Sequence, residues 1–293
     1  MPQADLGNIQ LEYEQVGEGE PLLLIMGIGA QLVLWPDGLL EALRAQGFAT
    51  LRYDHRDVGR STWMKDAPTP PIGRLLARRA AGLPVAAPYS LSDLARDAAG
   101  LMDHVGWARA HVVGVSMGGM VAQHLAIEHP ERVISLTSVM STTGARFDGL
   151  PKPAALRALL SPRPATEDGA AEWFRRFQDA VAGPGFPYDP AAVEAVARLA
   201  YRRGANPAGF ARHFAAILAS GDRTEALRGL RAPTLVLHGG ADPLVPPSGG
   251  RATAAAVPGA KLKVVPGWGH GLPPGIWPTL IEAIGAHAKL SAG

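Results

Sequence analysis

Residues 112–120 read Val-Val-Gly-Val-Ser-Met-Gly-Gly-Met, an apolar run that ends in the pentapeptide Gly114-x-Ser116-x-Gly118. A helical pattern follows immediately, so this stretch predicts a buried strand, a sharp turn and a helix. The arrangement is typical of a nucleophile elbow, in which glycines allow close approach and a serine occupies the strained turn with its hydroxyl exposed. Ser116 is therefore the first candidate catalytic residue.

The elbow belongs to a regular alternation of short apolar runs with helical patterns. The runs are too short for helices and too uniformly apolar for half-exposed strands, so they predict parallel strands buried on both faces. Two further segments, 3–6 and 9–16, alternate around Gly7-Asn8 and predict an N-terminal hairpin at the sheet edge. The sequence therefore predicts an α/β fold: a mostly parallel eight-stranded sheet with helices on both faces. The six apolar runs are residues 21–26, 48–53, 111–115, 133–139, 234–237 and 262–265.

The alternation stops between the sixth and seventh predicted strands, over residues 142–231. Amphipathic helical patterns separated by glycine and proline replace it, so we expect an inserted helical cap there, with residues 1–141 and 232–293 forming the catalytic core. The four patterns cover residues 153–160, 172–181, 191–203 and 207–220. The cap aromatics are candidate pocket walls, although packing within the cap is an equally good explanation for each. They are Trp173, Phe174, Phe177, Phe186 and Tyr188.

Three shorter segments also predict local structure. The proline-rich stretch 62–88 contains a short helical pattern at 74–80, and Ser90-Leu-Ser-Asp93 has the pattern of a capping box at the start of a helix. Residues 54–61 predict a structural turn in which Asp54, Arg56 and Asp57 pair with one another.

Composition excludes several classes of protein. A chain of 293 residues with 47% hydrophobic content is long enough for one catalytic domain with an inserted subdomain. The formal net charge is +2 and the basic residues are dispersed, so we expect no nucleic-acid partner. The absence of cysteine excludes disulfides and thiolate metal sites. With no basic leader and no apolar run near ~20 residues, we expect a cytoplasmic protein without a membrane span.

A serine nucleophile needs a base, because its hydroxyl is almost fully protonated near neutral pH. Among nine histidines, His270 is the best candidate. It lies in Gly267-Trp-Gly-His-Gly-Leu-Pro, directly after the last predicted strand, and so at the C-terminal edge of the sheet where the elbow also lies. Seven of the others fall within helices, at helix or strand ends, or in a turn.

The base in turn needs a carboxylate to orient it. Asp242 follows the strand 234–237 and therefore reaches the same edge of the sheet. Ser116, Asp242 and His270 occur in the chain order expected of a catalytic triad on such a sheet. Asp148, beyond the sixth strand, is the alternative acid, and an Asx turn before Pro243 is an alternative role for Asp242.

Backbone N–H groups are expected to hold the developing oxyanion. Met117, directly after the serine, supplies one, and Ile28, in the glycine-rich loop after the first apolar run, supplies the other. The chain has no His-Glu-x-x-His, no Walker loop and no complete dinucleotide fingerprint, so the sequence predicts neither metal nor cofactor. The expected pocket residues are Gly27, Trp35, Met140, Trp173, Phe186 and Leu244.

Several stretches resemble serine hydrolases of the α/β-hydrolase superfamily, in particular the subgroup with anthracycline (aclacinomycin) methyl esterases and actinobacterial lipases and esterases. They are residues 22–27, 35–37, 52–61, 110–119, 233–236 and 267–273. The resemblance implies an ester hydrolase with Ser116, Asp242 and His270 as its triad. Met26 and Val115 depart from the superfamily, which often has histidine at these positions, and they bear on substrate choice and on the shape of the oxyanion site.

The expected function is that of a serine carboxylesterase that acts through an acyl-enzyme on hydrophobic esters of small to medium size. The expected partner is a small-molecule ester, and the protein is expected to be a monomer or homodimer. Two alternatives stay open at this stage: cofactor-free perhydrolase or lyase chemistry with the same triad, and a slow-turnover receptor on this fold.

Overall fold

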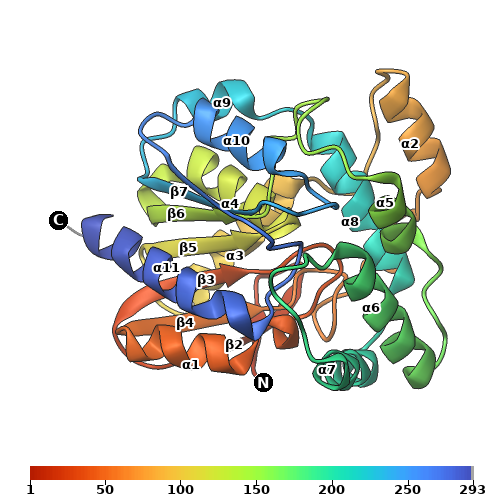
Figure 1. Cartoon of the computed structure of the whole chain (residues 1–293), viewed down its shortest axis with the longest axis horizontal. Helices are drawn as coiled ribbons and strands as arrows, with labels where there is room; N and C mark the ends of the chain where they lie inside the picture. Colours follow the sequence, from red (N-terminus) through yellow and green to blue (C-terminus); the bar gives the residue numbers. More distant parts are fainter. Residues whose placement is uncertain (292–293) are drawn as a thin grey trace.

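A computed structural model describes residues 1–291 and contains one twisted sheet (Figure 1). Its strands, in spatial order, are β1 (Gln3–Asp5), β2 (Gln10–Val16), β4 (Phe48–Tyr53), β3 (Glu20–Ile25), β5 (Ala110–Val115), β6 (Val133–Val139), β7 (Thr234–Gly239) and β8 (Lys261–Val265). The pairs β1–β2 and β2–β4 are antiparallel, and every later pair is parallel. The predicted mostly parallel eight-stranded sheet with an N-terminal hairpin is confirmed.

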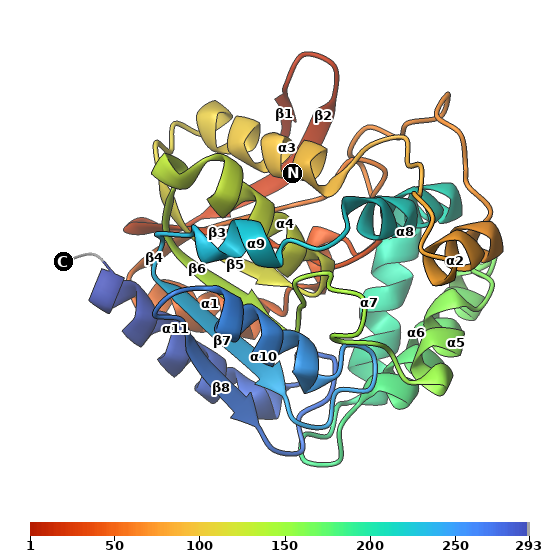
Figure 2. The ribbon, with the colours of Figure 1, turned by 90° about the horizontal axis from the view of Figure 1, so that it is seen from above.

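Helices cover both faces of the sheet, as predicted (Figure 2). One face is packed by α1 (Asp37–Ala45) and α11 (Trp277–Ser291), and the other by α3 (Leu91–His104), α4 (Met117–Glu128) and α10 (Pro247–Ala256). Each layer buries its own apolar cluster. Helix α3 begins at Ser90, whose side chain and that of Asp93 form the predicted capping box. Single 3₁₀ turns occur at Leu32–Leu34, Pro130–Arg132 and Pro274–Ile276.

The edge strand β8 differs from its prediction. The sequence predicted a strand buried on both faces, whereas its first three residues are exposed and its last two are only half-buried. The reason is its place at the end of the sheet, where one side has no neighbouring strand. Lys261 and Lys263 suit that position, because charged side chains protect an open edge from pairing with another chain.

Between β6 and β7 the chain forms five helices, and α5 to α8 gather beside the C-terminal edge of the sheet (Figures 1 and 2). They are α5 (Pro153–Leu160), α6 (Glu167–Val181), α7 (Pro190–Arg203), α8 (Pro207–Ser220) and α9 (Thr224–Arg228). Helix α6 begins five residues earlier than expected, because the Thr166 side chain caps it by accepting the Gly169 N–H. Helix α2 (Ile72–Ala80) packs against α8, whereas α9 contacts α4 and α10.

The three charged residues of the turn at 54–61 do not pair with one another, contrary to the prediction. Arg56 bonds to Asp97 on α3 at 2.5 Å. Asp54 and Asp57 instead bond to arginines of the inserted helices, Arg203 on α7 and Arg212 on α8, each at 2.6 Å. Both aspartates are fully buried, and a buried carboxylate needs a cationic partner, which the helices packed over the turn supply. This turn therefore ties α7 and α8 to the sheet.

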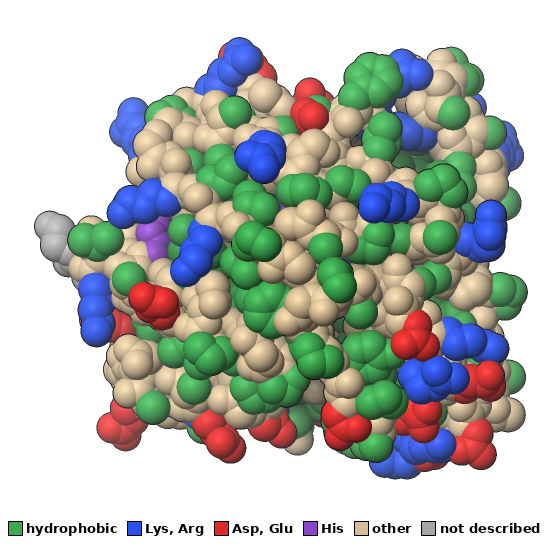
Figure 3. Space-filling model, viewed as in Figure 1, with side chains coloured by type: hydrophobic (Ala, Val, Ile, Leu, Met, Phe, Trp, Pro, Cys, Tyr) green, Lys and Arg blue, Asp and Glu red, His purple; other side chains and the backbone are tan. Residues whose placement is uncertain are grey.

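The outer surface of α6 and α7 is charged with both signs (Figure 3). Glu167 and Asp168 on α6 pair with Arg202 and Arg198 on α7. Such exposed pairs add little stability, but they mark this face as the solvent side of the two helices. Within residues 1–291, no helix is both long enough and apolar enough to cross a membrane.

Candidate active site

Ser116 stands at a strained turn between β5 and α4. Its backbone has φ of 57° and ψ of −120°, a region that L-residues rarely occupy. Glycine is required on either side: a Cβ on Gly114 would lie 2.2 Å from the Gly118 carbonyl oxygen, and one on Gly118 would lie 2.0 Å from the Ile25 oxygen. The sequence prediction of a strand, tight turn and helix at this point is confirmed.

Asp242 and His270 are joined by a short hydrogen bond. The Nδ1 atom of His270 lies 2.6 Å from Oδ2 of Asp242, and both side chains are buried. The second carboxylate oxygen accepts the N–H groups of Leu244 and Val245 at 2.8 and 2.9 Å. A carboxylate held in this way keeps the proton on Nδ1 of the imidazole and leaves Nε2 free to accept another proton.

Ser116 and His270 line the same cavity. Their side chains form no direct hydrogen bond in residues 1–291, a common state for catalytic pairs before substrate binds. The His270 loop is held from the other side as well, because its N–H donates to the carbonyl oxygen of Val181 at the end of α6. Asp148, the alternative acid, does not line this cavity.

A second histidine, His238, which was not among the candidates predicted from the sequence, lies beside the same carboxylate. Its Nε2 donates to the Val245 carbonyl oxygen at 2.7 Å and lies 3.8 Å from Oδ2 of Asp242. Burial lowers the pKa of His238, which keeps its imidazole neutral. Its only sequence signal is its place at the end of β7, four residues before Asp242.

Two backbone donors beside the serine are unengaged. Within the described part of the chain, the N–H groups of Ile28 and Met117 have no hydrogen-bond acceptor. The loop that carries Ile28 is fixed on both sides: Met26 O accepts from His55 Nε2 at 3.1 Å, and the Gly29 N–H donates to His213 Nδ1 at 3.3 Å. The geometry leaves two N–H groups available to an anionic oxygen at this edge of the sheet.

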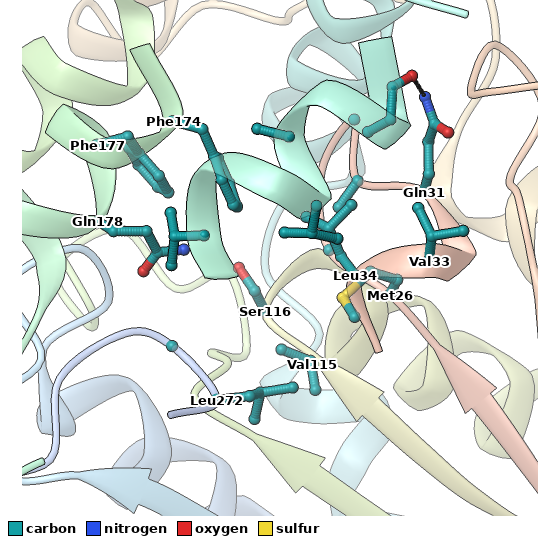
Figure 4. Close-up of a pocket in the computed structure, with 18 of the residues that line it drawn as sticks. Met26, Gln31, Val33, Leu34, Val115, Ser116, Phe174, Phe177, Gln178 and Leu272 are labelled. Carbon is teal, nitrogen blue, oxygen red and sulfur yellow. Dashed lines mark hydrogen bonds between the residues drawn. The ribbon is translucent and has the colours of Figure 1, made fainter. Parts of the chain in front are cut away.

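The cavity has a volume of about 670 Å³ and a mostly apolar lining. Figure 4 shows Ser116 directed into it, with Phe174, Phe177 and Gln178 on the side of the inserted helices. All six predicted pocket residues line it, as do all five cap aromatics singled out in the sequence. A cavity of this size is typical of small-molecule sites.

The comparisons with known proteins agree with this fold. The sequence profile of a family described as "alpha/beta hydrolase fold" matches residues 20–273. Rhodomycin D methylesterase DnrP of Streptomyces peucetius is 29% identical over 99% of each chain, and DauP of Streptomyces sp. (strain C5) is 30% identical over 96% of this chain and 95% of its own. The solved structure of an enol-lactonase from Burkholderia xenovorans LB400 has a TM-score of 0.72 and 24% identity, covering 98% of this chain and all of its own.

The chain belongs to the α/β-hydrolase family. The fold predicted from the sequence is confirmed, and so is the resemblance to methyl esterases, since both full-length relatives carry that name. The names of these relatives and the family match also support the predicted enzyme class, an ester hydrolase on this fold.

Proposed function

We propose that the protein is a serine carboxylesterase with Ser116 as nucleophile, His270 as general base and Asp242 as the acid that orients it. The observation that carries the proposal is the Asp242–His270 hydrogen bond of 2.6 Å on the wall of the cavity into which the elbow serine points. A serine at a strained turn can have a purely structural role. A strained serine that shares a cavity with a carboxylate-bound histidine is instead typical of a catalytic site.

The reaction starts when Ser116 Oγ attacks the ester carbonyl carbon and its proton passes to Nε2 of His270. Asp242 stabilises the imidazolium that forms, through the Nδ1 hydrogen bond. The N–H groups of Ile28 and Met117 bind the oxyanion, and they need no rearrangement because no other acceptor occupies them in the described chain. His270 then protonates the alcohol as it leaves, which gives the acyl-enzyme.

Water completes the cycle by the same route. His270 takes a proton from the water, the hydroxide attacks the acyl carbon, and Ser116 regains its proton when the acid leaves.

We assign residues 142–231 to a cap that selects the ester. The aromatic side chains of α6 face the cavity, whereas the charged side chains of α6 and α7 face solvent. A volume of about 670 Å³ accommodates a hydrophobic ester of medium size. The relatives named for methyl-ester hydrolysis favour a substrate with a small alcohol group and a larger acyl group.

A fluorophosphonate probe together with p-nitrophenyl esters of graded acyl length tests the nucleophile. We expect one label on the peptide that holds Ser116, and neither label nor turnover in Ser116→Ala. Ser92→Ala is the matched control, because Ser92 is a half-buried residue of α3 outside the cavity wall, and among the described residues its hydroxyl bonds only to Glu128 and Arg96. Labelling at another serine, or full turnover by Ser116→Ala, would refute the assignment.

Asp242→Asn tests the orienting acid. The amide favours the wrong histidine tautomer, which lowers kcat by about 10⁴ in the serine proteases, so we expect a large loss in kcat with little change in KM. Asp148→Asn serves as the control, since Asp148 lies outside the cavity wall. A loss below tenfold for Asp242→Asn would move the acid role to another residue.

A further inference from the structure

Arg163, in the loop between α5 and α6, lines the cavity between two aromatic rings. Its guanidinium carbon lies 3.7 Å from the centre of the Trp173 ring and 4.1 Å from that of Phe210. Both distances are within the range of cation–π contact, so the rings hold the guanidinium in place. No pattern in the sequence singles out this residue.

The charge of Arg163 has no carboxylate partner. Within residues 1–291, no Asp or Glu oxygen lies within 4.0 Å of its nitrogens, and only Nη1 donates a hydrogen bond, to the carbonyl oxygens of Leu159 and Ser161 at 2.9 and 3.1 Å. Burial lowers its pKa to about 10, so the group is still charged near neutral pH. By contrast, the buried Arg203 and Arg212 are both paired with carboxylates. The buried Arg223 also lacks a carboxylate partner, but its Nε, Nη1 and Nη2 all donate to neutral oxygens. Arg163 differs because its Nε and Nη2 have no acceptor among the described residues, and a half-buried cation is costly when its donors are left unsatisfied.

The acidic residues of the cavity wall are already engaged. Asp37 lies 3.1 Å from Arg52, Asp57 lies 2.6 Å from Arg212, and Asp189 caps α7 by accepting the Ala191 N–H. Among the described residues that line the cavity, Arg163 is the one arginine, and none is lysine. The described cavity wall therefore holds one arginine without a carboxylate partner, and its one acidic side chain without a cationic partner is Asp189, which caps α7.

We propose that Arg163 binds a carboxylate that the substrate carries in addition to its ester, so that the preferred substrates are half-esters of dicarboxylic acids or other esters with a second, anionic end. This inference rests on the proposed esterase function. The free Nε and Nη2 donors of the guanidinium match the two oxygens of a carboxylate, and the apolar wall around them strengthens the attraction. The acyl chain lies along the aromatic side chains, while the ester lies at Ser116.

The test compares pairs of p-nitrophenyl esters of equal length, one acyl chain ending in a methyl group and the other in a carboxylate. We expect kcat/KM of the wild type to favour the anionic ester by about tenfold to a hundredfold at one chain length, since hydrogen bonds to charged groups contribute on this scale. Arg163→Met should abolish that preference while neutral esters continue to turn over. Arg163→Lys should retain part of it, because the charge remains but the two-pronged geometry is lost.

Arg176→Met is the matched control, since Arg176 lies on the exposed side of α6, paired with Glu172, and does not line the cavity. It should keep the wild-type preference. Equal kcat/KM for both esters at every length, or a preference that survives in Arg163→Met, would overturn the inference.

A binding measurement separates this inference from the esterase proposal. Calorimetric titration of Ser116→Ala with monomethyl suberate and dimethyl suberate requires no turnover. We expect tighter binding of the monomethyl ester, lost on adding Arg163→Met. If the wild type hydrolyses no ester but Ser116→Ala binds the monomethyl ester more tightly, the esterase proposal is refuted and the anion site is retained. If the wild type hydrolyses esters but Ser116→Ala binds both suberates equally, the anion site is refuted and the esterase proposal is retained.

Discussion

The His213 ring on α8 accepts the Gly29 N–H at its Nδ1 atom, 3.3 Å away, although 184 residues separate the two in the chain. Its proton is consequently on Nε2, which donates to the Arg56 carbonyl oxygen at 2.9 Å. Gly29 directly follows Ile28, whose N–H is proposed to bind the oxyanion. A helix of the inserted segment therefore holds one side of the proposed oxyanion site, just as the end of α6 holds the His270 loop through Val181.

Replacing His213 should affect the chemical step more than substrate binding. His213→Leu removes the acceptor for the Gly29 N–H, so the Ile28 loop shifts and kcat falls about tenfold or more, with loss of one oxyanion donor, about 10²–10³, as the upper limit. His213→Asn retains an oxygen near the Nδ1 position and should lose much less. Steady-state kinetics of both variants with one p-nitrophenyl ester measure this. Equal losses in the two variants, or an effect confined to KM, would contradict a positioning role.

The buried pair His55 and His213 should make the protein less stable in acid. Burial lowers the pKa of His55 to about 3 and that of His213 to about 4, well below the usual value of about 6.5. Below about pH 6.5 these histidines bind protons in the unfolded chain but stay neutral in the folded protein until the pH nears their lowered pKa. Their contribution to the free energy of unfolding is therefore complete above about pH 6.5 and is lost as the pH falls toward 4. Each histidine contributes a slope of about 1.4 kcal/mol per pH unit.

Urea unfolding at several pH values between 7 and 4.5 measures that slope. Other buried histidines titrate in the same direction, so the informative quantity is the difference between the wild type and His213→Asn. We expect this difference to shrink by about 1.4 kcal/mol per pH unit below about pH 6.5, because the variant lacks one titrating group. Parallel stability curves would show that His213 binds protons equally in the folded and unfolded states, so that its pKa is not lowered by folding.

The backbone strain at Ser116 should be measurable as stability. With φ of 57°, a residue with a Cβ costs about 1–3 kcal/mol there, whereas glycine adopts this conformation freely. After subtracting about 0.5–1 kcal/mol for the greater freedom of unfolded glycine, Ser116→Gly should be more stable than Ser116→Ala by about 1 kcal/mol. The pair Ser92→Gly and Ser92→Ala, within helix α3, should show the opposite order. Chemical denaturation gives the free energy of unfolding of the four variants. If Ser116→Ala were as stable as Ser116→Gly or more stable, the backbone at residue 116 would not be strained.

The fold followed from the sequence where a residue's neighbours along the chain decide its structure. Mostly apolar runs such as 48–53 and 133–139 became strands with the predicted bounds, because strands buried on both faces are rich in apolar residues. The few polar residues within these runs are buried as well. The exposure of β8 was not predictable in this way, since it depends on which strand ends the sheet. Likewise, the partners of Asp54 and Asp57 are arginines of the inserted helices, at separations of 149 and 155 residues along the chain.

In the candidate site, too, some residues were predictable from local sequence patterns and others depend on tertiary packing. Glycine-rich turns after strands marked Ser116, Asp242 and His270, because parallel strands bring such turns to one edge. His213, His238 and Arg163 had no comparable signal. Their surroundings arise from the packing of the inserted helices and of the loop after β7, which no local pattern specifies.

The aromatic wall of the cap should determine which esters are accepted. Phe174 on α6 lines the cavity and stacks on Trp173 with ring centres 6.4 Å apart, so Phe174→Ala enlarges the cavity near the acyl chain (Figure 4). We expect the chain-length optimum of kcat/KM to move to longer esters, with about 1–3 kcal/mol of discrimination for each lost contact. The rate of labelling by a small phosphonate at Ser116 should stay near the wild-type value, because the proposed triad of Ser116, Asp242 and His270 is untouched.

Phe147→Ala is the matched control for this prediction. Phe147 belongs to the same segment 142–231 but is 75% exposed and does not line the cavity, so its removal should leave the chain-length profile unchanged. If Phe174→Ala lowered the melting temperature without moving the profile, the aromatic side chains of α6 would serve to pack the cap on itself. Selectivity would then lie with the core side of the cavity, at Trp35, Met140 and Leu244.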